Sequence, residues 1–239
     1  MRRSKTFKII LSGILLLTAG LLTLSYFTIR LNYGILEGRV VDELSRDVVR
    51  RLTISLGERT DILFQSKDFR FSGIQPGRYT LQAWAPHYEP FTREIEVQRG
   101  INAFDFAMRG AEIPDLAGII CFATPLDRGI EIEIRFHNTE NRGITDFPAL
   151  PLELTGSLFI REGDQENYTR GRLIYEGTIE LFWDPEAHLA RNKGIIPWDE
   201  IHVDPELEQR YGVLDLVLTT PQGVFEDTIT NVEFTRREE

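Results

Sequence analysis

Short apolar and polar stretches alternate with a period of two residues from Gly34 to residue 108. Val, Ile, Phe and Tyr are frequent in these stretches, and turn residues separate them, as expected for β-strands whose side chains point alternately to either face. Strands are predicted near residues 35–42, 48–56, 60–65, 69–74, 78–85, 91–98 and 102–108. Seven short strands without helical periodicity predict a β-sandwich domain over residues 35–109.

A second β-rich domain is predicted over residues 112–239, after the irregular sequence GAEIPD that ends at Asp115. The stretch from Ile130 to Phe136 alternates perfectly, which places Glu131 and Glu133 on the solvent face of a half-buried strand. Further strands are predicted at residues 116–123, 150–161, 171–182, 212–220 and 224–235.

Two short helices are predicted to interrupt these strands. Residues 184–194 offer an Asp N-cap, a Pro at the first helical position and a terminal Gly, and residues 204–212 repeat this pattern. The whole body is therefore predicted to be all-β apart from these two helices.

The segment before the body differs from it in hydropathy. Residues 9–29 contain no charged side chain, and a helix of 21 residues spans about 30 Å, the thickness of the hydrocarbon core of a bilayer. The preceding residues 1–8 carry four basic side chains and no acidic one, so this head is expected to stay in the cytoplasm. A retained single-pass transmembrane anchor with an extracytoplasmic (periplasmic or cell-surface) body is the main prediction. The alternative is a cleavable signal peptide, although its apolar region is typically shorter.

The net charge of the body limits the classes of molecule that it is expected to bind. Residues 30–239 hold 23 Lys and Arg against 37 Asp and Glu, which leaves a net charge of −14. Nucleic-acid binding needs basic surface to neutralise phosphates, so this class is excluded. The one cysteine, Cys121, excludes an intrachain disulfide and multi-cysteine metal sites, and its apolar neighbours indicate a buried thiol.

Three sequence motifs of the first domain are similar to those of a known domain family. They are Gly38-Arg-Val-Val-Asp42, Phe69-Arg-Phe-Ser-Gly-Ile-Gln-Pro-Gly-Arg-Tyr-Thr-Leu81 and Tyr88-Glu-Pro90. Their order and spacing resemble the carboxypeptidase regulatory-like domain, which implies a prealbumin-like, seven-stranded sandwich. Members of that family are non-catalytic modules attached to enzymes, adhesins, receptors and transporters, so the resemblance implies a fold but no particular activity.

The chain departs from the family pattern at two positions. Lys67 stands where the family usually has Gly before F-x-F, so a different turn is expected there. His87 also stands in place of a Gly; because a positive φ would be strained for His, Pro86 is expected to reshape this loop. Within the motif, Pro76 and Gly77 predict a type II turn in which Gly77 takes a positive φ.

Aromatic residues give the candidate binding sites. Trp84, His87, Tyr88 and Phe91 place four rings around one loop of the first domain, which is typical of an aromatic recognition patch, for example for sugar. The alternative is that Trp84 and Tyr88 pack the end of the sandwich, as strand aromatics commonly do.

In the second domain the candidates are Trp183, Trp198 and His202, in or beside the predicted helical insert. Inserts between strands commonly carry function, and Trp is a preferred interface anchor, so Trp198 is a candidate docking residue. The alternative is that the insert closes the end of a sandwich with both Trp side chains in its core. His188 and His202 with nearby carboxylates match no metal-ligand spacing, so no metal site is predicted.

The sequence contains no G-x-S-x-G elbow, no H-E-x-x-H and no P-loop, so no catalytic residue and no cofactor are predicted. The sequence therefore favours a non-catalytic, membrane-anchored envelope binding or scaffold protein, with a protein or polysaccharide partner. The alternative is a hydrolase-type enzyme with an unrecognised site in its second domain and the first domain as an accessory.

Overall fold

The computed structural model describes residues 32–164, 166–187, 189–203 and 210–234. These residues form two compact units. The first comprises residues 32–41, 48–86 and 90–108; the second comprises residues 42–47 and 87–89 together with the described residues from Arg109 onward.

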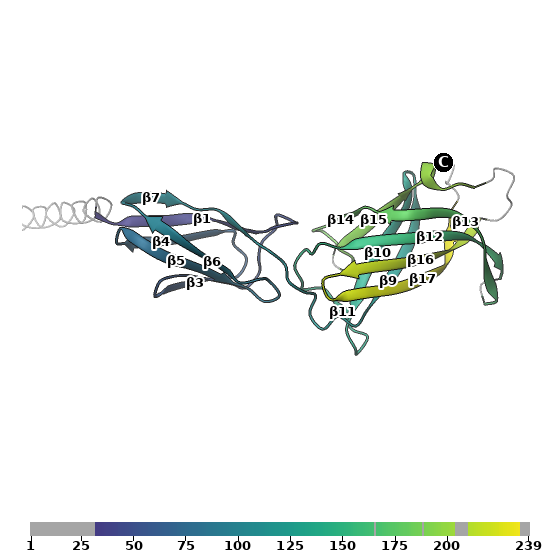
Figure 1. The fold of residues 1–239 in the computed structure, drawn as a ribbon, viewed down its shortest axis with the longest axis horizontal. Helices are drawn as coiled ribbons and strands as arrows, with labels where there is room; N and C mark the ends of the chain where they lie inside the picture. Colours follow the sequence, from purple (N-terminus) through teal and green to yellow (C-terminus); the bar gives the residue numbers. More distant parts are fainter. Residues whose placement is uncertain (1–31, 165, 188, 204–209, 235–239) are drawn as a thin grey trace, which may run out of the picture. The chain divides into compact units, whose positions relative to one another are not determined.

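The first unit contains two sheets of four strands (Figure 1). One sheet has the order β4-β1-β7, with β8 also paired to β1; the other has the order β3-β2-β5-β6. The strands are β1 (Gly34–Asp42), β2 (Leu52–Leu56), β3 (Arg59–Leu63), β4 (Asp68–Ile74), β5 (Gly77–Trp84), β6 (Phe91–Val97), β7 (Gly100–Ala103) and β8 (Phe106–Met108).

Alternation along each strand creates the core of the first unit. In β2, Leu52, Ile54 and Leu56 are buried, and the residues between them are only half-buried. Leu81 and Ala83 of the neighbouring strand β5 are buried in the same way. Every second side chain of this sheet therefore points inward, and the others lie on its outer face.

The second unit also consists of two antiparallel sheets (Figure 1). One has the order β11-β10-β15-β14, with β9 paired along β10; the other has the order β13-β12-β16-β17. The strands are β9 (Gly118–Leu126), β10 (Gly129–His137), β11 (Gly143–Ile144), β12 (Glu153–Gly163), β13 (Tyr168–Ile179), β14 (Leu181–Trp183), β15 (Asn192–Pro197), β16 (Tyr211–Thr220) and β17 (Gly223–Glu233). Ile130, Ile132, Ile134 and Phe136 of β10 form part of its core.

The predicted architecture requires correction, because the described residues form β-strands and residues 184–194 do not form the predicted helix. Asp184 begins a turn, in which its Oδ1 accepts from the backbone N–H groups of Glu186 and Ala187, and the chain then enters β15. Of the second predicted helix, residues 204–209 lie outside the described residues and Tyr211 begins β16. The helical element of this part of the described chain is the short 3-10 turn η1 (Trp198–Glu200).

The predicted transmembrane helix, residues 9–29, lies outside the described residues. No helix within the described ranges is long and apolar enough to cross a membrane. The architecture that the structure supports is thus two β units of eight and nine strands.

The first unit has eight strands where seven are predicted, because the last one is divided. Phe104 and Asp105 separate β7 from β8. The backbone N–H of Phe104 donates to the carbonyl of Glu37, and the Asp105 Oδ1 accepts from the backbone N–H of Arg39. These hydrogen bonds hold the backbone of Phe104 directly against Gly38, where a side chain would collide with the Phe104 carbonyl oxygen.

Two predictions about turns are wrong. Gly77 begins β5 without a positive φ; Gly73, at 66°, takes the left-handed conformation instead. His87 adopts a positive φ of 65°, so the preceding Pro86 does not reshape the loop in a way that avoids this strained conformation.

Candidate functional site

The outer face of the sheet β3-β2-β5-β6 presents an exposed tryptophan. Trp84 ends β5, and its side chain alternates with those of the buried Ala83 and Ala85. Its relative exposure of 54% is high for a tryptophan, which folded proteins usually bury in large part. An indole held on a sheet face is a flat apolar surface open to a ligand.

The strand register places Trp84 in line with two neighbours. Thr53 of β2 pairs with Trp84 on one side and with Ile62 of β3 on the other. Ile62 is also 54% exposed, and Phe64, directly after β3, is 69% exposed. Because neighbouring strands lie about 4.8 Å apart, Ile62 and Trp84 are about 10 Å apart in this line. We call Ile62, Thr53 and Trp84 the Trp84 row.

A second, polar row lies beside the first on the same face. Ser55 pairs with Thr60 and Gln82, and Gln82 pairs with Thr92. Thr60, Gln82 and Thr92 are exposed and Ser55 is half-buried, and no side-chain hydrogen bond within the described part of the chain engages their hydroxyl or amide groups. We call Thr60, Ser55, Gln82 and Thr92 the polar row, and the two rows together the Trp84 face.

The Trp84 face combines apolar and hydrogen-bonding groups. A hydroxyl group both donates and accepts hydrogen bonds, and a glutamine amide donates through its nitrogen and accepts through its oxygen. A pyranose ring has the matching chemistry, with an apolar C–H face that stacks on an aromatic ring and a rim of hydroxyl groups. The face therefore suits a sugar better than it suits an ion.

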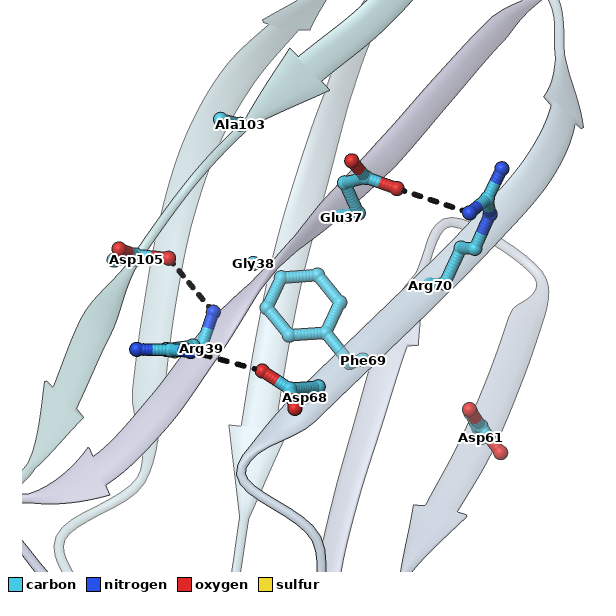
Figure 2. A pocket seen from close by; sticks show the side chains of 9 residues that line it. All are labelled: Glu37, Gly38, Arg39, Asp61, Asp68, Phe69, Arg70, Ala103 and Asp105. Atoms are coloured by element: carbon cyan, nitrogen blue, oxygen red, sulfur yellow. Dashed lines mark hydrogen bonds and ion pairs between the residues drawn. The ribbon is translucent and has the colours of Figure 1, made fainter.

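A separate groove of about 650 Å³ lies mainly over β1 and β4 of the other sheet of the first unit, with Asp61 of β3 also lining it (Figure 2). It is lined by Glu37, Gly38, Arg39, Asp61, Asp68, Phe69, Arg70, Ala103 and Asp105. Figure 2 shows two ion pairs across β1 and β4, Arg70 with Glu37 at 3.2 Å and Arg39 with Asp68 at 3.2 Å.

These groove charges are already paired and well exposed to solvent. The side chains of Arg39 and Asp68 are 71% and 73% exposed. Exposed ion pairs of this kind contribute little free energy.

The structure places the predicted tryptophans of the second unit against its core. Trp183 lies in β14, where its ring meets that of Phe147 edge-on at 5.7 Å. Trp198 also packs on the core, and its Nε1–H donates to the carbonyl of Leu126 at 2.8 Å. Trp183 pairs with Asn192, which lies six residues before Trp198, so the backbones of the two tryptophans are about 20 Å apart.

His202 is exposed, and its Nδ1 lies 2.8 Å from the carbonyl oxygen of Glu200. Within the described residues no group of three or more His, Cys, Asp or Glu is placed to hold a metal ion. Docking at Trp183, Trp198 and His202 stays a prediction that no observation tests.

The aromatic residues around the first domain's loop separate in the structure. Tyr88 belongs to the second unit, where its hydroxyl donates to Asp42 Oδ2 at 3.0 Å. Burial, followed by the charge of Asp42, raises the pKa of Tyr88 above its ordinary value. Phe91 stacks on Phe106 with ring centroids 4.2 Å apart. Of these four residues Trp84 is exposed, whereas His87, Tyr88 and Phe91 are half-buried.

Cys121 is a buried thiol in β9. Burial, followed by the nearby Asp227 carboxylate, raises the pKa of Cys121 to about 12. Asp227 Oδ2 also accepts from the backbone N–H of Cys121 at 2.6 Å. The thiol therefore stays protonated at neutral pH and is a poor nucleophile.

No protein-family model and no curated protein matches the chain. Among solved structures it is similar to a DUF3823 family protein from Bacteroides ovatus, with 13% identity over 84% of this chain and 100% of that chain and a TM-score of 0.29. It is also similar to a candidate carbohydrate-binding protein from Bacteroides uniformis, with 11% identity over 82% and 98% of the two chains and a TM-score of 0.29. The major pilin subunit of Bacillus cereus matches at 9% identity over 84% and 68%, again with a TM-score of 0.29. At these identities and scores the similarities assign neither a family nor a function.

Proposed function

We propose that this chain is a non-catalytic binding protein and that the Trp84 face of its first unit binds a polysaccharide. The observation that carries the proposal is the exposed indole of Trp84, fixed by strand pairing beside solvent-facing hydroxyl and amide groups. Stacking on the indole would supply affinity, and hydrogen bonds to the polar row would supply orientation.

A polysaccharide fits this surface better than a folded protein does. Stable protein interfaces bury about 800 Å² on each partner and have a fully desolvated apolar centre. The large apolar side chains exposed at the Trp84 face are Trp84, Ile62 and Phe64, and hydroxyl groups lie between and beside them. A protein partner remains the other outcome of the test.

The proposal includes the kind of module and its location. We propose that residues 35–109 form a carboxypeptidase regulatory-like module, on the motifs containing Gly38, Asp42 and Tyr88. We also propose that the body lies outside the cytoplasmic membrane, because residues 9–29 are uncharged and follow a basic head. If residues 9–29 are retained as an anchor, the protein is expected to stay in the membrane fraction after an alkaline carbonate wash, and its release would contradict that anchor.

Replacing Trp84 tests the binding surface. Trp84→Ala is expected to weaken binding to a neutral polysaccharide about tenfold or more, because a stacking aromatic commonly dominates such a contact. The measurement is affinity electrophoresis of the intact body in gels containing hydroxyethyl cellulose, xyloglucan, arabinoxylan, glucomannan or dextran.

The matched control is Phe182→Ala, which removes an exposed aromatic residue from the second unit. It is expected to leave retardation unchanged. Retardation by none of the five polymers, or equal retardation of wild type and Trp84→Ala, would overturn the proposal. Binding of a purified envelope protein that Trp84→Ala abolishes would instead assign the face to a protein partner.

A further inference from the structure

We infer that the Trp84 face takes an internal stretch of an uncharged polysaccharide, which lies across the strands from β3 to β5. This inference rests on the proposed function and specifies its ligand. It follows from three features of the face: two separated apolar contacts, a continuous polar row beside them, and the positions of the nearest charges.

The first feature is the pair of apolar contacts in the Trp84 row. Trp84 on β5 and Ile62 on β3 are both exposed, with Thr53 on the intervening strand β2 between them. A single sugar stacked on Trp84 cannot also cover Ile62 about 10 Å away. Phe64 directly follows edge strand β3, two residues after Ile62, and its 69% exposed side chain adds apolar surface beside the row rather than in line with it. Among sugar ligands, one of several linked sugars is therefore needed to contact all of these side chains.

The second feature is the polar row, which crosses the same strands in the same direction. Along each strand, the polar row is two residues away from the Trp84 row: Thr60 from Ile62, Ser55 from Thr53, and Gln82 from Trp84. Thr92 continues the polar row on β6, where it pairs with Gln82. Two residues of a strand span about 7 Å, so the rows run side by side at that separation. A chain of sugars lying on the Trp84 row would present its hydroxyl rim to the polar row along its length.

The third feature is the placement of charge. Within the two rows every side chain is neutral. On the far side of the polar row, Glu94 pairs with Thr80, and Glu96 pairs with Arg78. Glu94 stands two residues along β6 from Thr92, and a carboxylate beside the polar row disfavours an anionic glycan. Arg51, which precedes β2, is already engaged in an interaction within the protein.

Exposure at both ends of the Trp84 row favours an internal stretch over a chain end. Ile62 and Trp84, the two ends of the row, are each 54% exposed, so neither end is enclosed. A site that selects a chain end encloses the terminal sugar in a pocket. An open face of this kind lets the polymer continue past the edge of the sheet in both directions.

The test compares ligand length in Ile62→Ala, Phe64→Ala and Trp84→Ala variants of the intact body. Affinity is measured for the polymer that retards the wild type and for its monosaccharide to hexasaccharide fragments. We expect affinity to rise with fragment length over several sugars. Ile62→Ala and Phe64→Ala are each expected to lower polymer affinity at least threefold while leaving monosaccharide binding unchanged. Raising NaCl from 0.1 to 0.5 M is expected to leave polymer affinity unchanged, since only charged contacts are screened.

The outcomes separate this inference from the function on which it depends. If Trp84→Ala weakens binding while Ile62→Ala and Phe64→Ala do not, the site holds a single sugar and the inference is overturned while the proposed function stands. Preference for alginate or hyaluronan over the neutral polymers would overturn the assignment of an uncharged ligand. If no variant changes polymer binding, the proposed function itself fails. All three side chains are exposed, so unchanged thermal unfolding is the check that each variant is folded.

Discussion

Gly38→Ala is expected to lower the free energy of unfolding of the first unit by about 3 kcal/mol or more, the upper range of overpacking substitutions. A Cβ at this position would lie 1.9 Å from the carbonyl oxygen of Phe104 and 2.6 Å from its carbonyl carbon. Both are backbone atoms, so no side-chain rotation relieves the contact. The hydrogen bonds from Phe104 to Glu37 and from Arg39 to Asp105 hold this backbone in place, so moving it would break the link between β7 and β8.

The measurement is urea unfolding of the intact body, with Gly77→Ala as control. Gly77 lies in the same unit with a φ that any residue adopts, and a Cβ there would be 3.8 Å from Tyr79, an ordinary contact. Gly77→Ala is therefore expected to change the free energy of unfolding by less than about 0.5 kcal/mol. Equal stabilities of the two variants would show that the chain does not cross Gly38 as described.

Asp42→Ala is expected to destabilise the second unit by about 3 kcal/mol, because it leaves several buried groups without a hydrogen-bond acceptor. Asp42 is only 2% exposed. Its Oδ1 accepts from the backbone N–H groups of Leu44 and Ser45, at 2.9 and 2.8 Å. Its Oδ2 accepts from the Tyr88 hydroxyl at 3.0 Å and from the backbone N–H of Ala149 at 3.2 Å. One carboxylate thus fixes three segments that are far apart in the sequence.

Two further variants calibrate this effect by the same unfolding measurement. Tyr88→Phe removes one of the four hydrogen bonds and is expected to cost about 1 kcal/mol. Asp127→Ala removes an exposed carboxylate and is expected to have an effect within about 0.5 kcal/mol. If Asp42→Ala behaves like Asp127→Ala, the carboxylate does not hold these segments together.

The strands could be predicted because burial of one face imposes a period of two residues, as in the stretch from Ile130 to Phe136. The helix predicted over residues 184–194 was wrong because its N-terminal signals also suit a single turn. Asp184 accepts from two backbone N–H groups in that turn, as a helix N-cap would. The residues from Asn192 to Gly194 instead form part of strand β15, because they pair with β10 on one side and with β14 on the other. Such pairing depends on residues distant in the sequence, which a local pattern does not reveal.

Only part of the candidate site could be predicted, because strand pairing brings together residues that are distant in the sequence. Trp84 was singled out by residue type, but its neighbours on the face were not. Thr53 and Ile62 are 31 and 22 residues away in the sequence, and only the register of β3, β2 and β5 brings them into line with Trp84. Tyr88 was grouped with Trp84 because the two are near in sequence, although its hydroxyl is bound to Asp42. The strand registers, once known, could have identified the Thr, Ser and Gln side chains of the polar row.

Access of a small quencher to Trp84 tests the polysaccharide-binding face most directly. The chain has three tryptophans; Trp84 is exposed, whereas Trp183 and Trp198 are partly buried against the core of the second unit. Acrylamide quenching of tryptophan fluorescence is measured with and without a saturating amount of the neutral polysaccharide that retards the protein, in the wild type and in Trp84→Phe. The polysaccharide is expected to reduce quenching in the wild type and to have no such effect on Trp84→Phe. Bound polysaccharide that leaves wild-type quenching unchanged, or that protects Trp84→Phe equally, would contradict binding at the Trp84 face.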